Sequence, residues 1–196
     1  MKFWILFLTT LLILGCETPE VETDDKQVIN EKSLISFASH FDLIQSDDNF
    51  LLHLMSPESG EIEQRYFLTK EQKGSKKGYI TIKTPSTKLI TLSGTSIGML
   101  ATLNEQDRIV GVSSKNYIYD ERTLNRIKTN LVIEIGNESN LPLEKIIKAK
   151  PQLILYNGFG SEFSGSKKLN AVNIKSLPIY DWRETHPLGN AEWIKL

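Results

Sequence analysis

Cysteine and histidine are scarce in this sequence. The 196 residues include one cysteine, Cys16, and three histidines, His40, His53 and His186. A single thiol cannot form an internal disulfide, so the folded part of the chain has to be stabilised by its apolar core alone. The histidines are scattered, and no group of His, Asp and Glu residues has the spacing of a metal site. The sequence therefore predicts no metal and no resident cofactor.

An excess of charge of one sign is also missing. The chain has 23 Lys and Arg residues against 24 Asp and Glu residues, and the two signs are interspersed. A nucleic-acid-binding domain needs a clustered basic face, so we expect no nucleic-acid partner. Residues 73–78 form a short basic patch, but their Gly and Ser residues are typical of a loop.

Catalytic motifs are absent as well. The sequence has no Gly-x-Ser-x-Gly nucleophile elbow and no phosphate-binding loop that ends in Gly-Lys followed by Ser or Thr. Gly158, Gly160 and Gly165 follow an apolar stretch, but their spacing does not match the dinucleotide-binding fingerprint. A binding role fits better than catalysis, and we expect no catalytic residue and no enzymatic activity.

One apolar run stands out, at residues 3–14. It follows the positive charge of Lys2 and is shorter than the ~20 residues of a membrane-spanning helix, which is typical of a secretory signal. The run ends in Gly15-Cys16, which resembles the lipobox of bacterial lipoproteins. That resemblance implies cleavage after Gly15 and lipidation of Cys16. The alternative is an ordinary signal peptide with an incidental cysteine.

The segment after the signal has the composition of a tether. Residues 1–15 are the expected signal peptide, and residues 16–32 are acidic with few apolar side chains. Such a segment buries too little surface to offset chain entropy, so we expect a flexible, lipid-anchored tether. Its acidic start also resembles surface-export signals of some Bacteroidetes lipoproteins, with a merely solvated linker as the alternative. We expect a cell-envelope location, on the periplasmic face or the outer surface.

Residues 33–85 have the pattern of strands. Apolar and polar residues alternate over 41–45, 50–55 and 62–68, and residues 79–83 are a further strand candidate. This pattern predicts an N-terminal β-rich extension with a small antiparallel element.

From residue 86 the pattern changes to short apolar strands that alternate with helices. The expected order is strand 89–92, a helix over 97–103 capped by Thr95 or Ser96, strand 108–112, helix 121–127, strand 131–135, a helix begun by Pro142, strand 153–156, strand 177–180 and a helix begun by Pro187. Such alternation favours an α/β fold, here a Rossmann-like, mostly parallel sheet lobe over residues 86–182 that is flanked by helices.

Ligands of parallel sheets bind outside the carboxyl ends of the strands. That rule selects residues 93–96, 113–119, 157–163 and 181–184. The first segment offers hydroxyls at a helix start, where anion binding and plain helix capping are equally good interpretations. The candidate ligand-binding residues are Ser93, Thr95, Ser96, Tyr117, Tyr119, Asn157, Phe159, Trp182 and Arg183. The two tyrosines have a second interpretation, packing against the sheet edge.

Several motifs then resemble one family. Lys88-Leu-Ile-Thr-Leu-Ser93, followed by a helix and Asp107-Arg-Ile-Val-Gly-Val112, resembles the substrate-binding proteins of class III ABC importers, which carry ferric siderophores, haem or cobalamin. The strongest match is Leu143-Glu-Lys-Ile-Ile-Lys-Ala-Lys-Pro-Gln-Leu-Ile-Leu155. Residues 157–165, 184–189 and 191–194 look like the Bacteroidetes branch of this family. The resemblance covers residues 88–196, a little over half of the chain.

The resemblance implies a function. A lipoprotein of this family captures a metal chelate and delivers it to an ABC permease in the membrane. It implies two lobes joined by a long helix, so residues 183–196 are the expected start of that linker helix and the second lobe is missing. It also implies that Glu144 docks onto permease arginines, on the carboxyl edge of the sheet, with a plain capping charge paired to Lys148 as the alternative. A surface lipoprotein with an enzymatic or adhesive α/β domain is the competing hypothesis.

Overall fold

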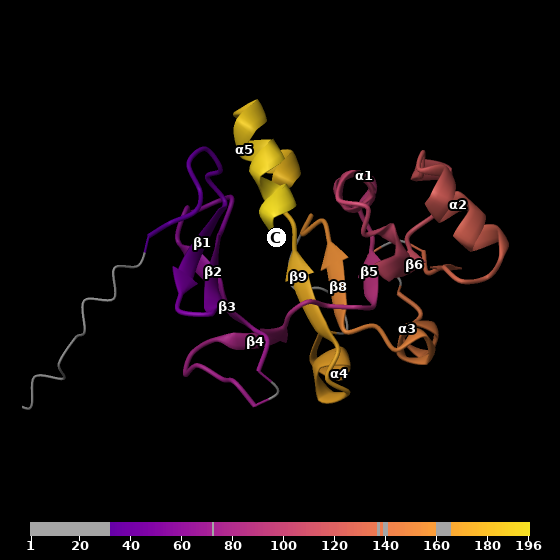
Figure 1. Cartoon of the computed structure of the whole chain (residues 1–196), viewed down its shortest axis with the longest axis horizontal. Coiled ribbons are helices and arrows are strands. Elements are labelled where there is room, and N and C mark those ends of the chain that lie inside the picture. Colours follow the sequence, from indigo (N-terminus) through magenta and orange to yellow (C-terminus); the bar gives the residue numbers. More distant parts are fainter. Residues whose placement is uncertain (1–31, 72, 137, 139–140, 160–165) are drawn as a thin grey trace, which may run out of the picture. The chain divides into compact units, whose positions relative to one another are not determined.

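The chain forms two β-sheets with connecting helices (Figure 1). This computed structural model describes residues 32–71, 73–136, 138, 141–159 and 166–196. The expected signal peptide, Cys16 and all but the last residue of the expected tether lie outside these residues. Within them, no helix is long and apolar enough to cross a membrane.

The smaller sheet comes from the N-terminal extension. Its strands β1 (Phe41–Ser46), β2 (Asn49–Met55), β3 (Ile62–Thr69) and β4 (Ile80–Lys83) lie in that order. The first three are antiparallel, as the alternating pattern predicts, but β4 runs parallel to β3. A parallel neighbour needs a crossover rather than a hairpin, and residues 70–79 supply its length.

The larger sheet is fully parallel and carries the Rossmann-like lobe. Its strands are β5 (Leu89–Thr91), β6 (Ile109–Val112), β7 (Ile133–Glu134), β8 (Leu153–Tyr156) and β9 (Lys175–Pro178), in the order β7-β6-β5-β8-β9. All five expected strands are present. The last one begins and ends two residues earlier than the apolar pattern suggests, because Ile179 and Tyr180 are buried beyond the end of the strand.

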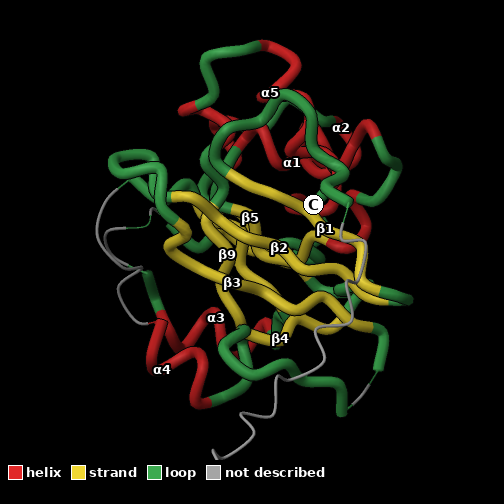
Figure 2. The backbone as a smooth tube through the Cα atoms, turned by 90° about the vertical axis from the view of Figure 1, so that its left-hand side faces the viewer, coloured by secondary structure: helices red, strands yellow, loops and turns green. Residues whose placement is uncertain are grey.

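Helices connect these strands. They are α1 (Gly94–Thr102), α2 (Glu121–Lys128), α3 (Leu143–Ala149), α4 (Ser166–Ala171) and α5 (Pro187–Glu192), with short 3₁₀ turns at Gln106–Arg108, Lys115–Tyr117, Asp181–Arg183 and Trp193–Lys195. Helix α4 has no counterpart among the predicted elements, since Leu169 is its only buried residue. Figures 1 and 2 both show α1, α2 and α5 toward one end of the molecule and α3 and α4 toward the other. The arrowheads of β8 and β9 point toward the first group (Figure 1).

Successive residues of the parallel strands are buried on opposite faces. Leu89 and Leu153 belong to a core cluster that they share with β2 and β3 of the small sheet and with Trp193. Their neighbours Ile90 and Ile154 belong to a second cluster, with Ile146 of α3 and Leu169 of α4. The small sheet therefore covers one face of the parallel sheet, and the helices α3 and α4 cover the other. Burial on both faces accounts for the nearly continuous apolar sequence of β8.

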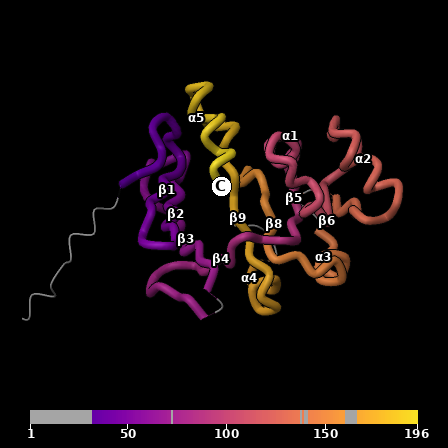
Figure 3. The backbone as a smooth tube through the Cα atoms, viewed as in Figure 1, coloured from indigo at the N-terminus to yellow at the C-terminus, as the bar shows by residue number. Residues whose placement is uncertain are grey.

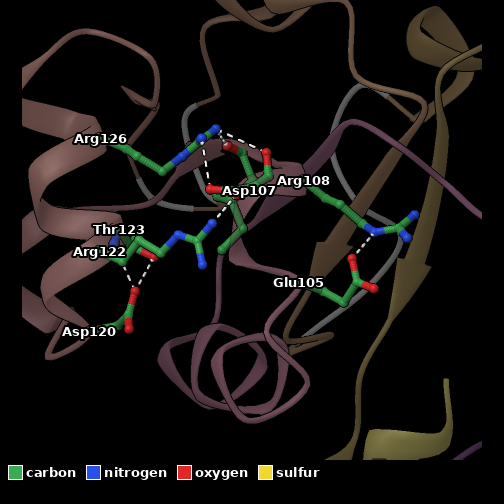
Figure 4. A network of polar contacts seen from close by, with 8 residues as sticks. Glu105, Asp107, Arg108, Asp120, Arg122, Thr123 and Arg126 are labelled. Carbon is green, nitrogen blue, oxygen red and sulfur yellow. Dashed lines mark hydrogen bonds and ion pairs between the residues drawn. The ribbon is translucent and has the colours of Figure 1, made fainter.

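A polar network holds α2 against the turn that precedes β6 (Figure 4). Arg126 of α2 forms an ion pair with Asp107, with 3.1 Å between its Nη1 and Oδ1, and donates to the carbonyl oxygens of Asp107 and Ile109. Arg122 forms a second ion pair with the same carboxylate. The side chain of Asp120 caps α2 by accepting from the backbone N–H of Thr123 at 2.7 Å. These contacts fix α2 to the turn at the amino end of β6.

A pair of glutamates joins the two ends of the described chain. Glu192 accepts hydrogen bonds from the backbone N–H groups of Ser36, Phe37 and Ala38, at 2.7–3.2 Å, and Glu184 accepts from those of Ser39 and His40. We call these two carboxylates the glutamate clamp. The segments that it joins are far apart in sequence, yet they lie side by side, as the first coloured residues and α5 do in Figure 3. Five successive amides are thereby bound by two side chains.

Candidate functional site

Trp182 is the centre of a cluster at the carboxyl ends of β8 and β9. Its indole Nε1 donates to the backbone oxygen of Asn157 at 2.8 Å, which ties the loop after β8 to the turn after β9. The ring of Phe159 lies 4.7 Å from the indole, centroid to centroid. The guanidinium carbon of Arg183 lies 4.4 Å from the centroid of the indole ring. The structure thus brings together four of the predicted ligand-binding residues, here named the Trp182 cluster.

The Trp182 cluster is open to solvent. Phe159 is 66% exposed and Trp182 is 40% exposed, although both are large aromatic side chains. Arg183 also forms an exposed ion pair with Glu58, 3.4 Å between Nη2 and Oε1, from the turn between β2 and β3. An exposed pair of this kind contributes little to stability, so it leaves the guanidinium available to an anionic ligand. An aromatic surface beside a fixed cation suits a flat, negatively charged molecule.

The hydroxyls at the start of α1 differ in their exposure. Ser93 and Ser96 are buried, and Ser96 lines an apolar cavity. The exposed Thr95 instead hydrogen-bonds to the carboxylate of Asp181, which is itself buried. Burial raises the pKa of Asp181, while hydrogen bonds from the Trp182 backbone and from Thr95 oppose that shift. The anion at this helix start is therefore a side chain of the protein.

The N-cap of α1 also differs from the sequence prediction. The cap is Ser93, and its side chain makes no capping hydrogen bond, so neither Thr95 nor Ser96 has that role. Both lie inside the helix, because the chain already turns at Gly94. A Cβ at Gly94 would lie 3.2 Å from the backbone oxygen of Tyr117, and this close approach joins the first loop to the second.

The loop after β6 presents its two tyrosines to solvent. Tyr117 is 69% exposed and Tyr119 is 91% exposed. Packing against the sheet edge, which the sequence left open, is therefore not observed. Among the described residues, no ring contact or hydrogen bond joins these tyrosines to the Trp182 cluster, so they form a separate exposed aromatic surface at the same end of the sheet.

The loop after β8 is shaped by Gly158. Its φ of +61° is unfavourable for any other residue, and a Cβ there would lie 2.4 Å from Cε1 of Tyr180. Two carboxylates that the sequence does not single out, Glu58 and Glu138, also reach this edge. Glu138 accepts a hydrogen bond from the backbone N–H of Asn157. Glu58 lies between two antiparallel strands, so the strand-end rule could not select it. Glu138 does follow a parallel strand, β7, but the loop after that strand was not among the four selected segments.

Glu144 lies elsewhere. It is exposed, and none of the ion pairs between described residues includes it, so the pair with Lys148 that the alternative interpretation requires is not formed. Its helix α3 lies at the same end of the molecule as α4, away from α1 and α5 (Figures 1 and 2). The expectation of a place at the carboxyl edge is not supported by this arrangement. The sequence between β7 and α3 is long enough to cross the sheet before the helix begins.

Comparisons with known proteins give partial matches. No family model matches the chain. An uncharacterized lipoprotein of Methanocaldococcus jannaschii is 24% identical over 85% of this chain and 46% of its own length. The chain thus spans about half the length of this curated relative.

Solved structures match a smaller part of the chain. A periplasmic heme-binding protein from Roseiflexus sp. RS-1 is 21% identical over 46% of this chain and 32% of its own, with a TM-score of 0.38. A periplasmic vitamin B12 binding protein of Vibrio cholerae is 17% identical over 57% of this chain and 46% of its own, with a TM-score of 0.36. A periplasmic heme binding protein from Pseudomonas aeruginosa has a TM-score of 0.39, at 11% identity over 56% and 41% of the two chains. All three of these solved structures are periplasmic binding proteins.

Proposed function

We propose that this chain is part of a lipid-anchored binding protein that captures a metal chelate, such as haem, a ferric siderophore or a cobalamin, for an ABC importer. The observation that carries the proposal is the Trp182 cluster, an exposed aromatic pair beside a guanidinium at the carboxyl ends of β8 and β9. The motifs that resemble this class of protein lead to the same edge of the sheet.

The chemistry of the cluster suits such a ligand. Phe159 and Trp182 offer aromatic faces on which a flat macrocycle or a catecholate ring stacks. Arg183 offers planar, paired N–H donors to a carboxylate such as a haem propionate. No step of this function requires bond breaking, so we propose binding rather than catalysis.

Delivery requires a partner in the membrane. We propose that Cys16 carries the lipid that holds the protein in the cell envelope, and that Glu144 contacts the permease. The support for Glu144 is its match to the family motif and its exposed side chain without an ion pair among the described residues. Because Glu144 lies outside the Trp182 cluster, ligand binding and docking are separable.

Titration of the purified protein with haemin, a ferric hydroxamate siderophore and cyanocobalamin tests the binding proposal. We expect saturable binding of one of the three. Trp182→Ala should weaken it about threefold to tenfold, since an aromatic contact contributes about 0.5–1.5 kcal/mol. Arg183→Ala should weaken an anionic chelate by more than tenfold, since a hydrogen bond to a charged group contributes about 1.5–3 kcal/mol.

Leu131→Ala is the matched control, because Leu131 is 60% exposed and belongs to none of the loops at this edge. Its affinity should equal that of the unmodified chain. No saturable binding of any of the three chelates, or an equal loss in the control, would contradict the proposal.

A further inference from the structure

A basic hollow lies at the end of the parallel sheet opposite the Trp182 cluster. Its volume is about 610 Å³, and it lies between β4, the loop before β4, and the amino ends of β8 and β9. Three lysines line it from three different segments: Lys73 from the loop, Lys83 from β4 and Lys175 from β9. Glu71 is the one acidic residue among the described residues that line it.

The charge of these lysines is not compensated locally. No ion pair or side-chain hydrogen bond involves the ammonium groups of Lys73, Lys83 or Lys175 within the described ranges. The side-chain amides of Asn170 and Asn173 line the same hollow and offer further N–H donors. The chain as a whole has a formal net charge of -1, so this concentration of positive charge is a local feature.

The surroundings extend the positive surface. Lys167 and Lys168 are exposed on α4, which ends at the hollow. Lys77 is exposed in the loop before β4. A lysine ammonium is a compact point charge with three donors, and phosphate groups are its usual oxyanion partners.

We propose that this hollow binds the phosphate groups of anionic phospholipids, so that the protein rests on a membrane surface while its Trp182 cluster stays accessible. Positive charge near an anionic bilayer is attracted to the surface, and each lysine there contributes about a fivefold gain in affinity. The choice of a membrane as partner rests on the proposed lipid anchor at Cys16, but the hollow itself does not depend on it. The carboxyl and amino ends of β8 are separated by the length of the strand, so one surface leaves the other accessible.

Co-sedimentation with vesicles tests the proposal without the anchor. The unacylated full chain, as Cys16→Ser, is mixed at low salt with phosphatidylcholine vesicles that contain increasing fractions of phosphatidylglycerol. We expect binding that rises with the anionic fraction and disappears in 1 M salt, where charges are screened within about 3 Å. Lys73→Gln/Lys83→Gln should weaken the binding about twentyfold.

Lys115→Gln/Lys128→Gln is the matched control, since both lysines lie outside the hollow and the net charge changes equally. It should weaken binding less than threefold. Equal losses in the two double variants, or no binding to anionic vesicles, would overturn the proposal. Binding of inorganic phosphate by the hollow without binding of vesicles would also overturn it, because the site would then take a free anion.

Chelate titration of Lys73→Gln/Lys83→Gln separates this inference from the proposed function. The affinity for the chelate should stay unchanged, because the hollow and the Trp182 cluster lie at opposite ends of β8 and β9. A protein that binds no chelate but still binds anionic vesicles through these lysines would contradict the proposed function alone.

Discussion

Removing the carboxylate of Glu192 should release the segment around Phe37 without unfolding the domain. Three backbone N–H groups donate to this side chain, and Lys195 donates to it at 2.8 Å. The released amides would regain water, so we take the net contribution of a typical intramolecular hydrogen bond, about 1 kcal/mol, for each of the three backbone amides. Glu192→Ala should then lower the free energy of unfolding by about 3 kcal/mol, and Glu192→Gln by about 1–2 kcal/mol.

Urea denaturation and amide hydrogen exchange measure these effects. A domain stability of about 5–15 kcal/mol leaves the Ala variant folded. Exchange at the amides of Ser36, Phe37 and Ala38 should speed up about a hundredfold, since each 1.4 kcal/mol corresponds to a factor of ten. Glu144→Gln is the control and should change stability by less than about 0.5 kcal/mol, as exposed substitutions do. A change that small in both Glu192 variants would refute the reasoning.

The clamp also gives stability a dependence on pH. Burial raises the pKa of Glu192, but the ammonium group of Lys195 and the three backbone amides together lower it, from 4.5 to about 2. A carboxylate whose pKa is lower in the folded state stabilises that state fully above its unfolded pKa. Stability should therefore fall as the pH decreases from 4.5 toward 2, and Glu192→Gln should lose less stability than the unmodified chain over that interval.

Three further outcomes test the envelope location, the shape of the loop after β8 and docking. Cys16→Ser should move the protein from the membrane fraction to the soluble fraction, whereas unchanged retention and no acyl mass on the N-terminus would contradict lipidation. Gly158→Ala should lower the free energy of unfolding by about 1–3 kcal/mol, because the new Cβ would clash with the Tyr180 ring and because alanine is unfavourable at a positive φ. An unchanged urea midpoint would contradict this. In the full-length protein, Glu144→Ala should leave chelate affinity unchanged and reduce uptake by whole cells. Normal uptake would mean that Glu144 is a solvated surface charge with no role in docking. A joint loss of binding and uptake would mean that it belongs to the ligand site.

The strands of both sheets were predictable because the residues that each strand buries stand close together in the sequence, as an apolar run or an alternating pattern. Leu153–Tyr156 is apolar throughout, and the structure buries it between the two core clusters. The parallel pairing of β4 with β3 was not predictable from alternation, since alternation gives the faces of a strand and not its direction. Helix α4 was missed because a single buried residue leaves no periodic pattern.

The candidate site was predictable only in part, for a physical reason. The strand-end rule selected Asn157, Phe159, Trp182 and Arg183, which the structure does bring together. It also selected the hydroxyls before α1, which turned out to be buried or bonded to Asp181. A rule based on the ends of strands identifies an edge, but it cannot say which polar groups at that edge already have partners within the protein.

The segment from Glu184 to Trp193 shows the same limit most clearly. It matched a family pattern, and the structure gives a local reason for several of its residues. His186 caps α5 by accepting from the backbone N–H of Leu188 at 3.1 Å. Gly189 leaves room for the N-terminal extension, since a Cβ there would lie 2.8 Å from the backbone oxygen of Phe37.

The partners of that segment, however, lie about 150 residues earlier in the chain, in a stretch with no pattern of its own. Glu184 illustrates this, because it binds the amides of Ser39 and His40 and also accepts from the indole of Trp193. Such contacts explain why the first residues after the tether pack against the last helix. The chain before the clamp is itself bound to β1, because Ser33 forms a bridge with Ile44 and the backbone N–H of Leu34 donates to the backbone oxygen of Leu43 at 2.8 Å. The glutamate clamp therefore adds a second set of contacts, with the last helix, to a segment that β1 already holds.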